Sequence, residues 1–308
     1  MANKKSNNLF SKIIKGVWIA FISMIILVLI GIFSVRINLF NLFGELPSYK
    51  SMENPEAEND LSSILISADG VELGKYYLTN RNQVTFDDIS PNLVEALLST
   101  EDLRFYDHSG IDPKGLLRAL VGKLTFSFRG GGSTITMQLA ENIFRTMTEN
   151  QGSLYKIDFL RPFIIKIKEW IISIQLEKSF TKDEIIAMYF NTIFFGHNSY
   201  GINTAATTFF NTTPDSLNYQ QSALLIGMLN APTRYSPISN PEMSLNKRTE
   251  VLYNLYKFDF IPRELFDSLK VLPLGIEYTL QDHLTGPAPY FRQVIRPQLI
   301  YWAKENGY

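Results

Sequence analysis

Apolar positions recur at helical spacing along most of the chain. Ser90 and Pro91 are typical of a helix start. The apolar positions Leu93 and Leu97 follow, and Glu101 is the next position on that stripe. A carboxylate on a stripe that faces a core is partly removed from water, which favours its protonated form. Glu101 is therefore either a candidate general base or an acidic residue that ends a helix at the surface.

A second acidic residue lies on an apolar stripe further along. In a helix through 164–177, Glu169 shares one face with Ile172 and Leu176. Lys166 lies one turn away, where it can keep that carboxylate ionised or bind an anion beside it. The same pattern fits an ordinary amphipathic helix with Glu169 on its polar edge, and the sequence alone leaves both interpretations open.

The other patterned segments predict a mainly helical domain with one short β element. The segment 61–78 predicts a hairpin that turns at Asp69-Gly70. A capping box from Thr181 to Glu184 begins another helix. Further helices are predicted at 216–229 and 241–255.

The N-terminus carries an apolar run from 17 to 35. At a rise of about 1.5 Å per residue, this run spans roughly 30 Å, the thickness of the hydrocarbon layer. The preceding lysines place the N-terminus in the cytoplasm and the rest outside. A cleaved signal peptide is the alternative, but the length of the run favours an anchor. The predicted order is a cytoplasmic tail at 1–16, a transmembrane helix at 17–35 and a juxtamembrane linker at 36–60.

The segment 116–128 is both apolar and basic. Such a segment outside a membrane can lie on the bilayer. An ordinary core helix fits the pattern equally well.

Composition excludes several kinds of chemistry. The 308 residues include no Cys, which rules out disulfides, thiolate catalysis and Cys-based zinc sites. The formal net charge of −1 gives no global field for nucleic acid. The three histidines, His108, His197 and His283, lack metal-ligand spacing.

A glycine run precedes another predicted helix. Arg129 is followed by glycines through Gly132, and Ser133 or Thr134 can cap the helix. Free backbone N–H groups, hydroxyls and the helix dipole predict an anion site there. The Gly-Lys-Ser/Thr ending of a Walker loop is missing, and a plain flexible loop is the alternative.

Together these segments resemble glycosyltransferase family 51, the peptidoglycan glycosyltransferases. Residues 101–110 are similar to its opening motif, Glu-Asp-x-x-Phe-x-x-His-x-Gly. Residues 131–138 resemble its Gly-Gly-Ser-Thr-Ile-Thr-Gln-Gln motif, and residues 165–169 resemble Arg-Lys-x-x-Glu. Residues 182–191 resemble Lys-x-x-Ile-Leu-x-x-Tyr-x-Asn, and 247–252 resemble the last motif.

Four positions depart from the family pattern. Met137 stands in place of Gln, and Ile165 and Lys247 each stand in place of Arg. Glu141 stands where the family commonly has a Lys that meets the substrate diphosphate. This exchange reverses a charge beside a polyanionic ligand. It either weakens donor binding or is compensated by neighbouring cations such as Arg129 and Lys166.

The resemblance implies a lysozyme-like helical glycosyltransferase domain at 61–272. The residues 273–308 look like a stub or linker toward an absent C-terminal domain, as in a class A penicillin-binding protein. Ser-x-x-Lys matches at 153–156 and 244–247 lack a Lys-Thr-Gly partner. We therefore do not expect this chain to crosslink peptides or bind penicillin.

The resemblance also implies a reaction: polymerisation of lipid II into β-1,4-linked glycan, with inversion at the donor MurNAc and release of undecaprenyl diphosphate. Glu101 is implied as general base. Glu169, Lys166 and a divalent cation, Mg or Mn, are implied at the leaving diphosphate. Asp102 is expected to orient Glu101 or approach the metal. The implied substrate-binding residues are Phe105, His108, Arg129, Gly132, Ser133, Thr134, Gln138, Lys166, Asn191 and Arg248.

The implied location is the plasma (inner) membrane, with a single pass and an extracytoplasmic catalytic domain. The implied partners are lipid II, the growing glycan strand, the bilayer and cell-wall synthesis proteins, and no nucleic acid. Two alternatives stay open. One is a weak or inactive scaffold that binds lipid II or cell-wall partners. The other is a lysozyme-like enzyme that cleaves glycan.

Overall fold

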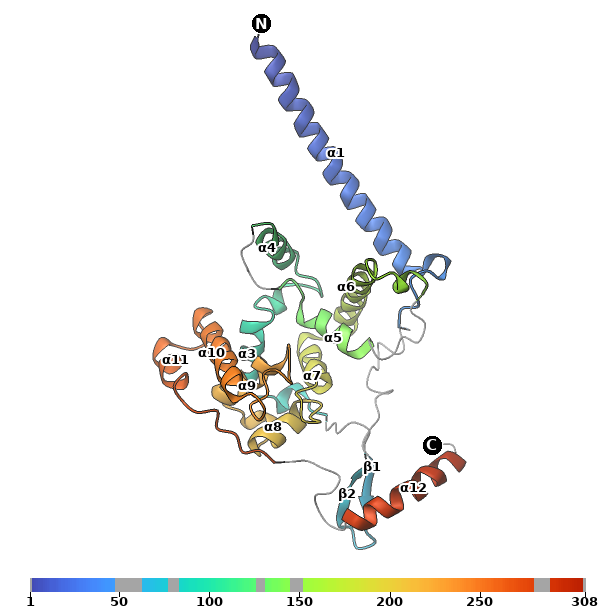
Figure 1. Ribbon diagram of the computed structural model, residues 1–308, viewed down its shortest axis with the longest axis vertical. Helices are drawn as coiled ribbons and strands as arrows, with labels where there is room; N and C mark the ends of the chain where they lie inside the picture. The colour runs from blue at the N-terminus through green and yellow to red at the C-terminus, as the bar shows by residue number, and fades with distance from the viewer. Residues whose placement is uncertain are drawn as a thin grey trace.

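The computed structural model shows a helical body from which one long helix extends (Figure 1). It describes residues 2–47, 63–76, 83–125, 131–144, 152–279 and 289–306. The α-helices of these residues are α1 Ala2–Arg36, α3 Pro91–Thr100, α4 Pro113–Leu124, α5 Ile135–Phe144, α6 Arg161–Ser179, α7 Lys182–Thr192, α8 Ile202–Phe210, α9 Tyr219–Met228, α10 Pro241–Lys257, α11 Arg263–Leu269 and α12 Pro289–Glu305. Short 3-10 helices are η1 Leu39–Asn41, η2 Phe86–Asp88, η3 Phe105–Asp107, η4 Leu154–Lys156 and η5 Pro214–Ser216. The prediction of a mainly helical fold is confirmed.

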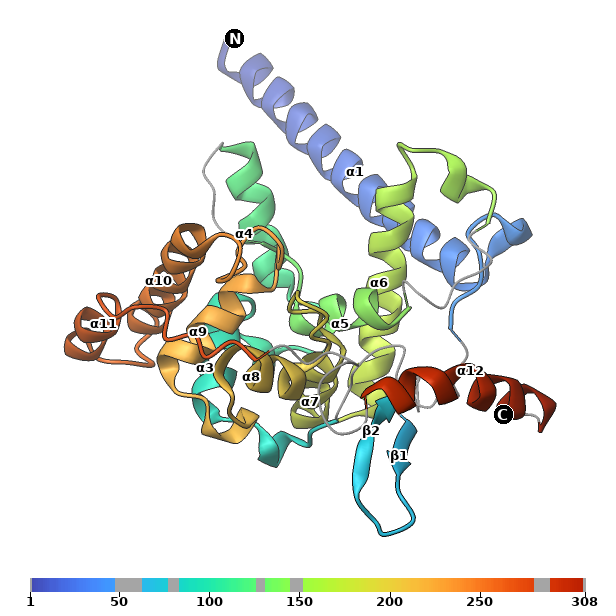
Figure 2. The same ribbon diagram turned by 60° about the horizontal axis from the view of Figure 1, so that its bottom comes forward.

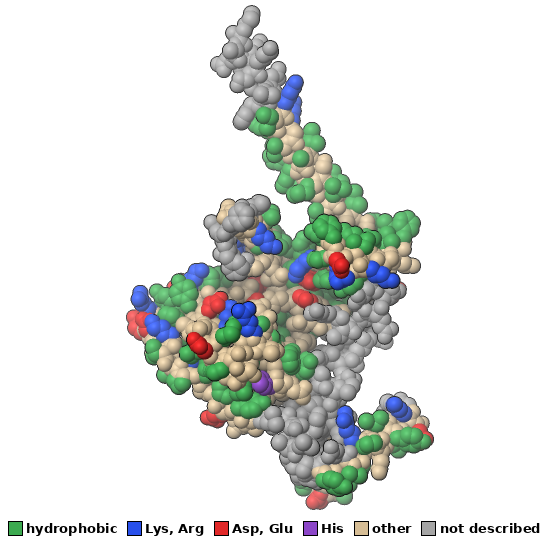
Figure 3. Space-filling model, in the orientation of Figure 1, with side chains coloured by type: hydrophobic (Ala, Val, Ile, Leu, Met, Phe, Trp, Pro, Cys, Tyr) green, Lys and Arg blue, Asp and Glu red, His purple; other side chains and the backbone are tan. Residues whose placement is uncertain are grey.

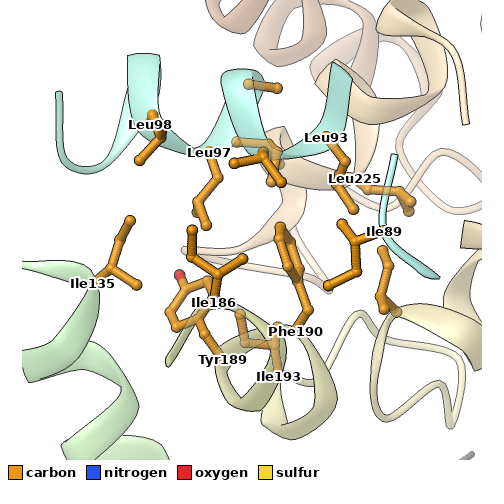
Figure 4. Packing of buried hydrophobic residues seen from close by; sticks show 14 of the residues in the cluster. Ile89, Leu93, Leu97, Leu98, Ile135, Ile186, Tyr189, Phe190, Ile193 and Leu225 are labelled. Carbon is orange, nitrogen blue, oxygen red and sulfur yellow. The ribbon is translucent and has the colours of Figure 1, made fainter. Parts of the chain in front are cut away.

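The hydrophobic core lies where α3, α5, α7, α8, α9 and α10 meet. Leu93 and Leu97 of α3 lie over α7, where Ile186 and Phe190 point back toward them (Figure 4). These four side chains are fully buried. Burying an aliphatic or aromatic side chain of this size stabilises a fold by about 1.5–3 kcal/mol. The stripe predicted on α3 therefore fixes the helix that carries Glu101.

The N-terminal helix is longer than the predicted span. α1 runs from Ala2 to Arg36, and its stretch Ser11–Arg36 is long and apolar enough to cross a membrane. Apolar side chains along it are exposed, including Leu27 at 67%. The end of α1 packs against α6, where a Cβ on Gly31 would lie 3.9 Å from Ile167 Cδ1. The helical body is thus tied to the base of this helix.

The predicted hairpin is confirmed. β1, Ser63–Ile66, pairs antiparallel with β2, Glu72–Tyr76, with an irregularity between Leu65 and Ile66. The turn uses Gly70 at a φ of 85°, a left-handed conformation that glycine adopts without a steric penalty. α12 contacts β2, and Figure 2 shows the two side by side; in Figure 1 they lie below the main helical body.

The segment after α11 is fastened to the helical body. Arg248 is fully buried and donates hydrogen bonds to the carbonyls of Leu272 (2.7 Å) and Pro273 (2.8 Å). The N–H of Glu277 donates to the carbonyl of Phe209 at 2.9 Å. Residues 273–279 thus pack on the domain that the sequence predicts to end at 272.

Candidate active site

Glu101 lies at the C-terminal end of α3, on the wall of a cavity of about 550 Å³. Its Oε2 accepts a hydrogen bond from Gln138 Nε2 (2.8 Å), and its Oε1 accepts one from Asn230 Nδ2 (3.1 Å). The side chain is half-buried. Glu101 therefore ends its helix and also faces a cavity, so the two interpretations left open by the sequence are not exclusive.

A buried tyrosine fixes the amide that holds Glu101. Tyr189 of α7 donates to Gln138 Oε1 at 2.7 Å. Burial, together with the nearby charge of Glu101, raises the pKa of Tyr189 well above its usual value, so its hydroxyl stays protonated. With its oxygen taken by Tyr189, Gln138 can only turn its NH₂ group toward Glu101.

Asp102 points away from this cavity. Its Oδ2 is 3.0 Å from His108 Nε2 and accepts from the N–H of Ile135 at 3.2 Å. The side chains of Asp102 and His108 are each only 5% exposed. Asp102 therefore holds the first turn of α5 and the loop that contains His108.

The described residues do not form a metal site around Asp102. Among them, no group of three or more His, Asp and Glu side chains could hold a metal ion. Asp102 lines neither cavity described here. We therefore derive no step of the reaction through a metal at Asp102, and the divalent cation stays a prediction.

The loop after Asp102 is fastened by the lysine of the fourth motif. Lys182 Nζ lies 4.2 Å from the ring centre of Phe105 and donates to the carbonyl of His108 at 2.7 Å. It also pairs with Glu177 at 2.8 Å. Phe105 is fully buried. The first and fourth motifs thus form one connected support for Glu101.

The glycine loop leads into a helix capped by Thr134, as predicted, and two backbone N–H groups of its first turn have partners in the protein. Thr134 Oγ1 accepts from the N–H of Met137 at 3.2 Å, which confirms Thr134 as the cap of α5. The N–H of Ile135 is already taken by Asp102. These two donors have protein partners, and the anion site stays a prediction. Arg129 lies outside the described residues.

Ser133 brings a hydroxyl to the cavity of Glu101, and Lys166 contacts that hydroxyl. Lys166 Nζ donates to Ser133 Oγ at 3.2 Å and pairs with Glu169 Oε2 at 2.6 Å. Ser133 lines the same cavity as Glu101. Gly132 packs against α4, because a Cβ placed on it would lie 3.1 Å from Leu116 Cδ2.

Glu169 lines a second cavity of about 330 Å³. It is buried at 4% exposure, which raises its pKa; Lys166 opposes this shift, and the charge of Glu141 adds to it. The sequence left open whether Glu169 faces solvent or the interior, and the structure places it in the interior wall of this cavity.

Glu141 lines both cavities. The two cavities therefore adjoin at α5, with Glu101 on the wall of one and Glu169 on the wall of the other. Ile165 lines the second cavity, where the family commonly has Arg. Arg161 and Lys168 line that cavity as well, so cations are present although positions 141 and 165 supply none.

Four predicted substrate-binding residues are interior residues in the structure. Phe105 and Arg248 are fully buried, and the side chain of His108 is held by Asp102. Asn191 is 7% exposed and bonds to both backbone groups of Val84, at 3.0 and 2.9 Å. These side chains contact protein groups and are not among the lining residues of the two cavities, and their substrate contacts stay predictions.

Two residues at the site were missed by sequence reasoning. Tyr189 belongs to the fourth motif, but nothing in the sequence shows which partner its hydroxyl takes. Asn230 lies after α9, outside the five motifs. Its only sequence signal is its place at a helix end two residues before Pro232, which predicts a turn without predicting a contact with Glu101.

The comparisons with known proteins give this constellation its family. The family model described as transglycosylase matches residues 69–256. The chain therefore belongs to the transglycosylase family.

The curated relatives are larger proteins. Penicillin-binding protein 1A of Escherichia coli (strain K12) is 32% identical over 245 residues, covering 79% of this chain and 27% of the relative. Penicillin-binding protein 1A/1B of Bacillus subtilis (strain 168) is 33% identical over 269 residues, covering 87% of this chain and 27% of the relative. The chain thus spans about a quarter of the length of these two relatives. A crystal structure of penicillin-binding protein 1A from Haemophilus influenzae matches with a TM-score of 0.42 and 19% identity, covering 79% of this chain and 25% of that chain.

Proposed function

We propose that this chain is a membrane-anchored peptidoglycan glycosyltransferase that polymerises lipid II into β-1,4-linked glycan. The observation that carries the proposal is the Glu101 carboxylate, held by Gln138 and Asn230 on a cavity wall. Membership of the transglycosylase family supports it. The proposed products are the lengthened glycan strand and undecaprenyl diphosphate.

In the proposed reaction, Glu101 takes the proton from the 4-hydroxyl of the acceptor GlcNAc. That oxygen attacks the anomeric carbon of the donor MurNAc from the face opposite the diphosphate. The new glycosidic C–O bond forms as the bond from carbon to the phosphate oxygen breaks, so the α-linked donor gives a β-linked product. The diphosphate leaves with both electrons of that bond, so charge at the leaving group must be neutralised.

Cations that line the second cavity, or contact its Glu169, can supply this neutralisation. Lys166 faces Ser133 on one side and Glu169 on the other. Arg161 and Lys168 add positive charge to the same cavity as Glu169. We propose that the lipid diphosphate lies along this border, and that these cations compensate for Glu141.

Two exposed apolar patches support a bilayer next to the site. On α4, Leu117 and Leu120 are 63% and 53% exposed. At the start of α6, Phe159 and Phe163 are 76% and 59% exposed. Both patches lie at the end of the body from which α1 extends, and Figure 3 shows hydrophobic side chains there beside Lys and Arg. We propose that α1 spans the membrane with a cytoplasmic N-terminus and that these patches rest on its outer surface.

The proposal is tested by reconstituting the full chain with lipid II in detergent or vesicles and separating glycan products on a gel. We expect polymer from the wild type and at least a hundredfold less from Glu101→Gln, because a positioned base contributes about 10²–10⁴-fold. Glu95→Gln is the matched control. Glu95 lies on the same helix but bonds to Tyr219, so polymer should form normally.

The same assay decides between the alternatives. Polymer made by Glu101→Gln at the wild-type rate would refute Glu101 as the base. Shortening of preformed glycan without lipid II would indicate a cleaving enzyme. Glu141 favours the scaffold alternative, because it removes a cation from the border of the two cavities. An inactive wild type that regains activity in Glu141→Lys would support that scaffold. Chelation with EDTA, followed by Mg or Mn, tests the divalent cation.

A further inference from the structure

The second oxygen of Glu101 is held by a residue outside the recognised motifs. Asn230 lies in the turn after α9 and donates from Nδ2 to Glu101 Oε1 at 3.1 Å. The turn is held by backbone bonds on both sides of Asn230: Leu229 N–H to Ile226 O (3.2 Å) and Ala231 N–H to Met228 O (3.1 Å). The amide is therefore presented to Glu101 from a fixed backbone.

We propose that Asn230 is a positioning residue for the general base: its amide holds the Glu101 carboxyl group in one orientation toward the cavity. This inference rests on the proposed function. It adds a residue that lies 129 positions from Glu101 in the chain.

The chemistry of the two donors supports this role. Glu101 is held by two neutral amides, whereas the cation Lys166 is paired with Glu169. Amide donors orient a carboxylate without the large loss of basicity that an ion pair causes. Neither NH₂ group can accept a hydrogen bond, so a proton on the oxygen that faces Asn230 would displace that bond. Asn230 thus directs the other oxygen of Glu101 and its proton-accepting position.

Asn230 is more exposed than Gln138, the other residue that holds Glu101. Gln138 is fixed by the buried hydroxyl of Tyr189, while Asn230 is exposed at the cavity mouth. Replacement of Asn230 can therefore change Glu101 without disturbing the core, which makes the inference testable by simple variants.

The test uses Asn230→Asp in the full chain, assayed for polymer across pH. Aspartate has the same shape but replaces the donor with a like charge, which favours the protonated form of Glu101. We expect the low-pH limb of the curve of rate against pH to move up by about one pH unit. At the low-pH end of this limb, kcat should be about tenfold lower than in the wild type, while KM should stay within about twofold of the wild-type value. Asn142→Asp is the matched control: it adds the same charge to the same cavity from α5, and its low-pH limb should move by less than half as much.

Two further variants separate positioning from substrate contact. Asn230→Ala should lower kcat by about tenfold, and Asn230→Gln, which keeps an amide donor, should recover part of that loss. A rise in KM at unchanged kcat in Asn230→Ala would make Asn230 a substrate contact and overturn the inference. A low-pH limb in Asn230→Asp that matches wild type, or that moves no more than in Asn142→Asp, would also overturn it.

A measurement without substrate keeps the inference separate from the proposed function. Selective ¹³C labelling of Glu carboxyl groups, with Glu101→Gln to assign the signal, follows the titration of Glu101 directly. The midpoint should rise in Asn230→Asp even if the chain makes no polymer. Wild-type inactivity would therefore refute the proposed function only, whereas an unchanged midpoint would refute the role of Asn230.

Discussion

Two adjacent acidic residues, Glu101 and Asp102, face opposite directions where α3 ends. Glu101 turns to the cavity, and Asp102 turns inward to His108 and the first N–H of α5. Because the chain leaves helical geometry at this point, neighbouring side chains separate to different surroundings. The interior bonds of Asp102 thereby hold the backbone that presents Glu101.

The buried carboxyl of Glu169 predicts a pH-dependent stability. Its pKa is raised by burial, so the folded state binds the proton more tightly than the unfolded state does. The stability of the wild type therefore falls as pH rises through that raised pKa. The side chain at position 169 cannot titrate in Glu169→Gln. The midpoint temperature of unfolding of this variant should therefore rise relative to that of the wild type between pH 5 and pH 8.

Thermal unfolding of the detergent-solubilised chain at the two pH values measures this difference. Glu95→Gln, on α3, should keep a constant offset from wild type. A Glu169→Gln offset that shrinks with rising pH would show that the ion pair with Lys166, rather than burial, dominates.

At the residue scale, the sequence could identify the acids but not their surroundings. Glu101 and Glu169 were found because each lies on an apolar stripe that local periodicity reveals. The interior positions of Asn191 and Arg248 depend on Val84 and on residues 269–273, which no local pattern connects to them. Motif resemblance marks such residues without distinguishing support from substrate contact.

At the element scale, the loop between α3 and α4 is closed by one glycine. Gly110 has a φ of 89°, and a Cβ placed on it would lie 2.8 Å from the backbone C and O of Ser173 in α6. Its carbonyl accepts from Thr134 Oγ1 at 2.6 Å. The loop, α5 and α6 therefore meet at a point that admits no side chain.

Gly110→Ala should destabilise the fold by about 2 kcal/mol or more, because left-handed strain and a backbone clash add. Chemical denaturation gives the change in free energy of unfolding. Gly131→Ala is the control, since a Cβ at Gly131 meets nothing within 4 Å. Equal free energies of unfolding for the two variants would contradict this prediction and show that the loop accommodates the added Cβ without destabilising the fold.

Element boundaries show where local rules suffice. The capping box at Thr181 and Glu184 begins α7 as predicted. Ser90 is the N-cap residue of α3 as predicted, but its hydroxyl makes no bond to the helix and instead donates to the carbonyl of Leu217 at 2.7 Å. The predicted helix at 216–229 begins only at Tyr219, because Asn218 caps it and residues 214–216 form a 3-10 turn. A partner distant in the sequence takes the Ser90 hydroxyl, whereas the local cap Asn218 sets the start of α9.

At the scale of the whole molecule, α4 and the start of α6, which carry exposed apolar side chains, lie at the end of the body from which α1 extends (Figure 1). Because the chain has no native cysteine, a single introduced cysteine gives one labelling site. A fluorophore on Leu120→Cys or Phe163→Cys in lipid nanodiscs should be quenched at least about twofold by nitroxide lipids, since these positions rest on the bilayer.

Ile66→Cys is the matched control. Ile66 is 57% exposed on the hairpin, which lies at the far end of the body from α1. Equal quenching at all three positions would contradict the proposed orientation of the domain on the membrane.

The global arrangement was only partly accessible from sequence. The helical periodicity and the motifs predicted a helical domain, the apolar run at 17–35 predicted an N-terminal apolar helix, and the structure has both. The division of the site into two adjoining cavities was not predictable, because α5 separates residues that come from α3, α6, α7 and the turn after α9.

The position of α5 has one more consequence. Gln138 is on its Glu101 side, Ala140 and Phe144 are on its Glu169 side, and Glu141 is on the boundary. Because α5 separates the two cavities, a shift of this helix widens one cavity and narrows the other. Two inhibitors, one in each cavity, therefore restrain the same helix. The binding of one should change the affinity for the other.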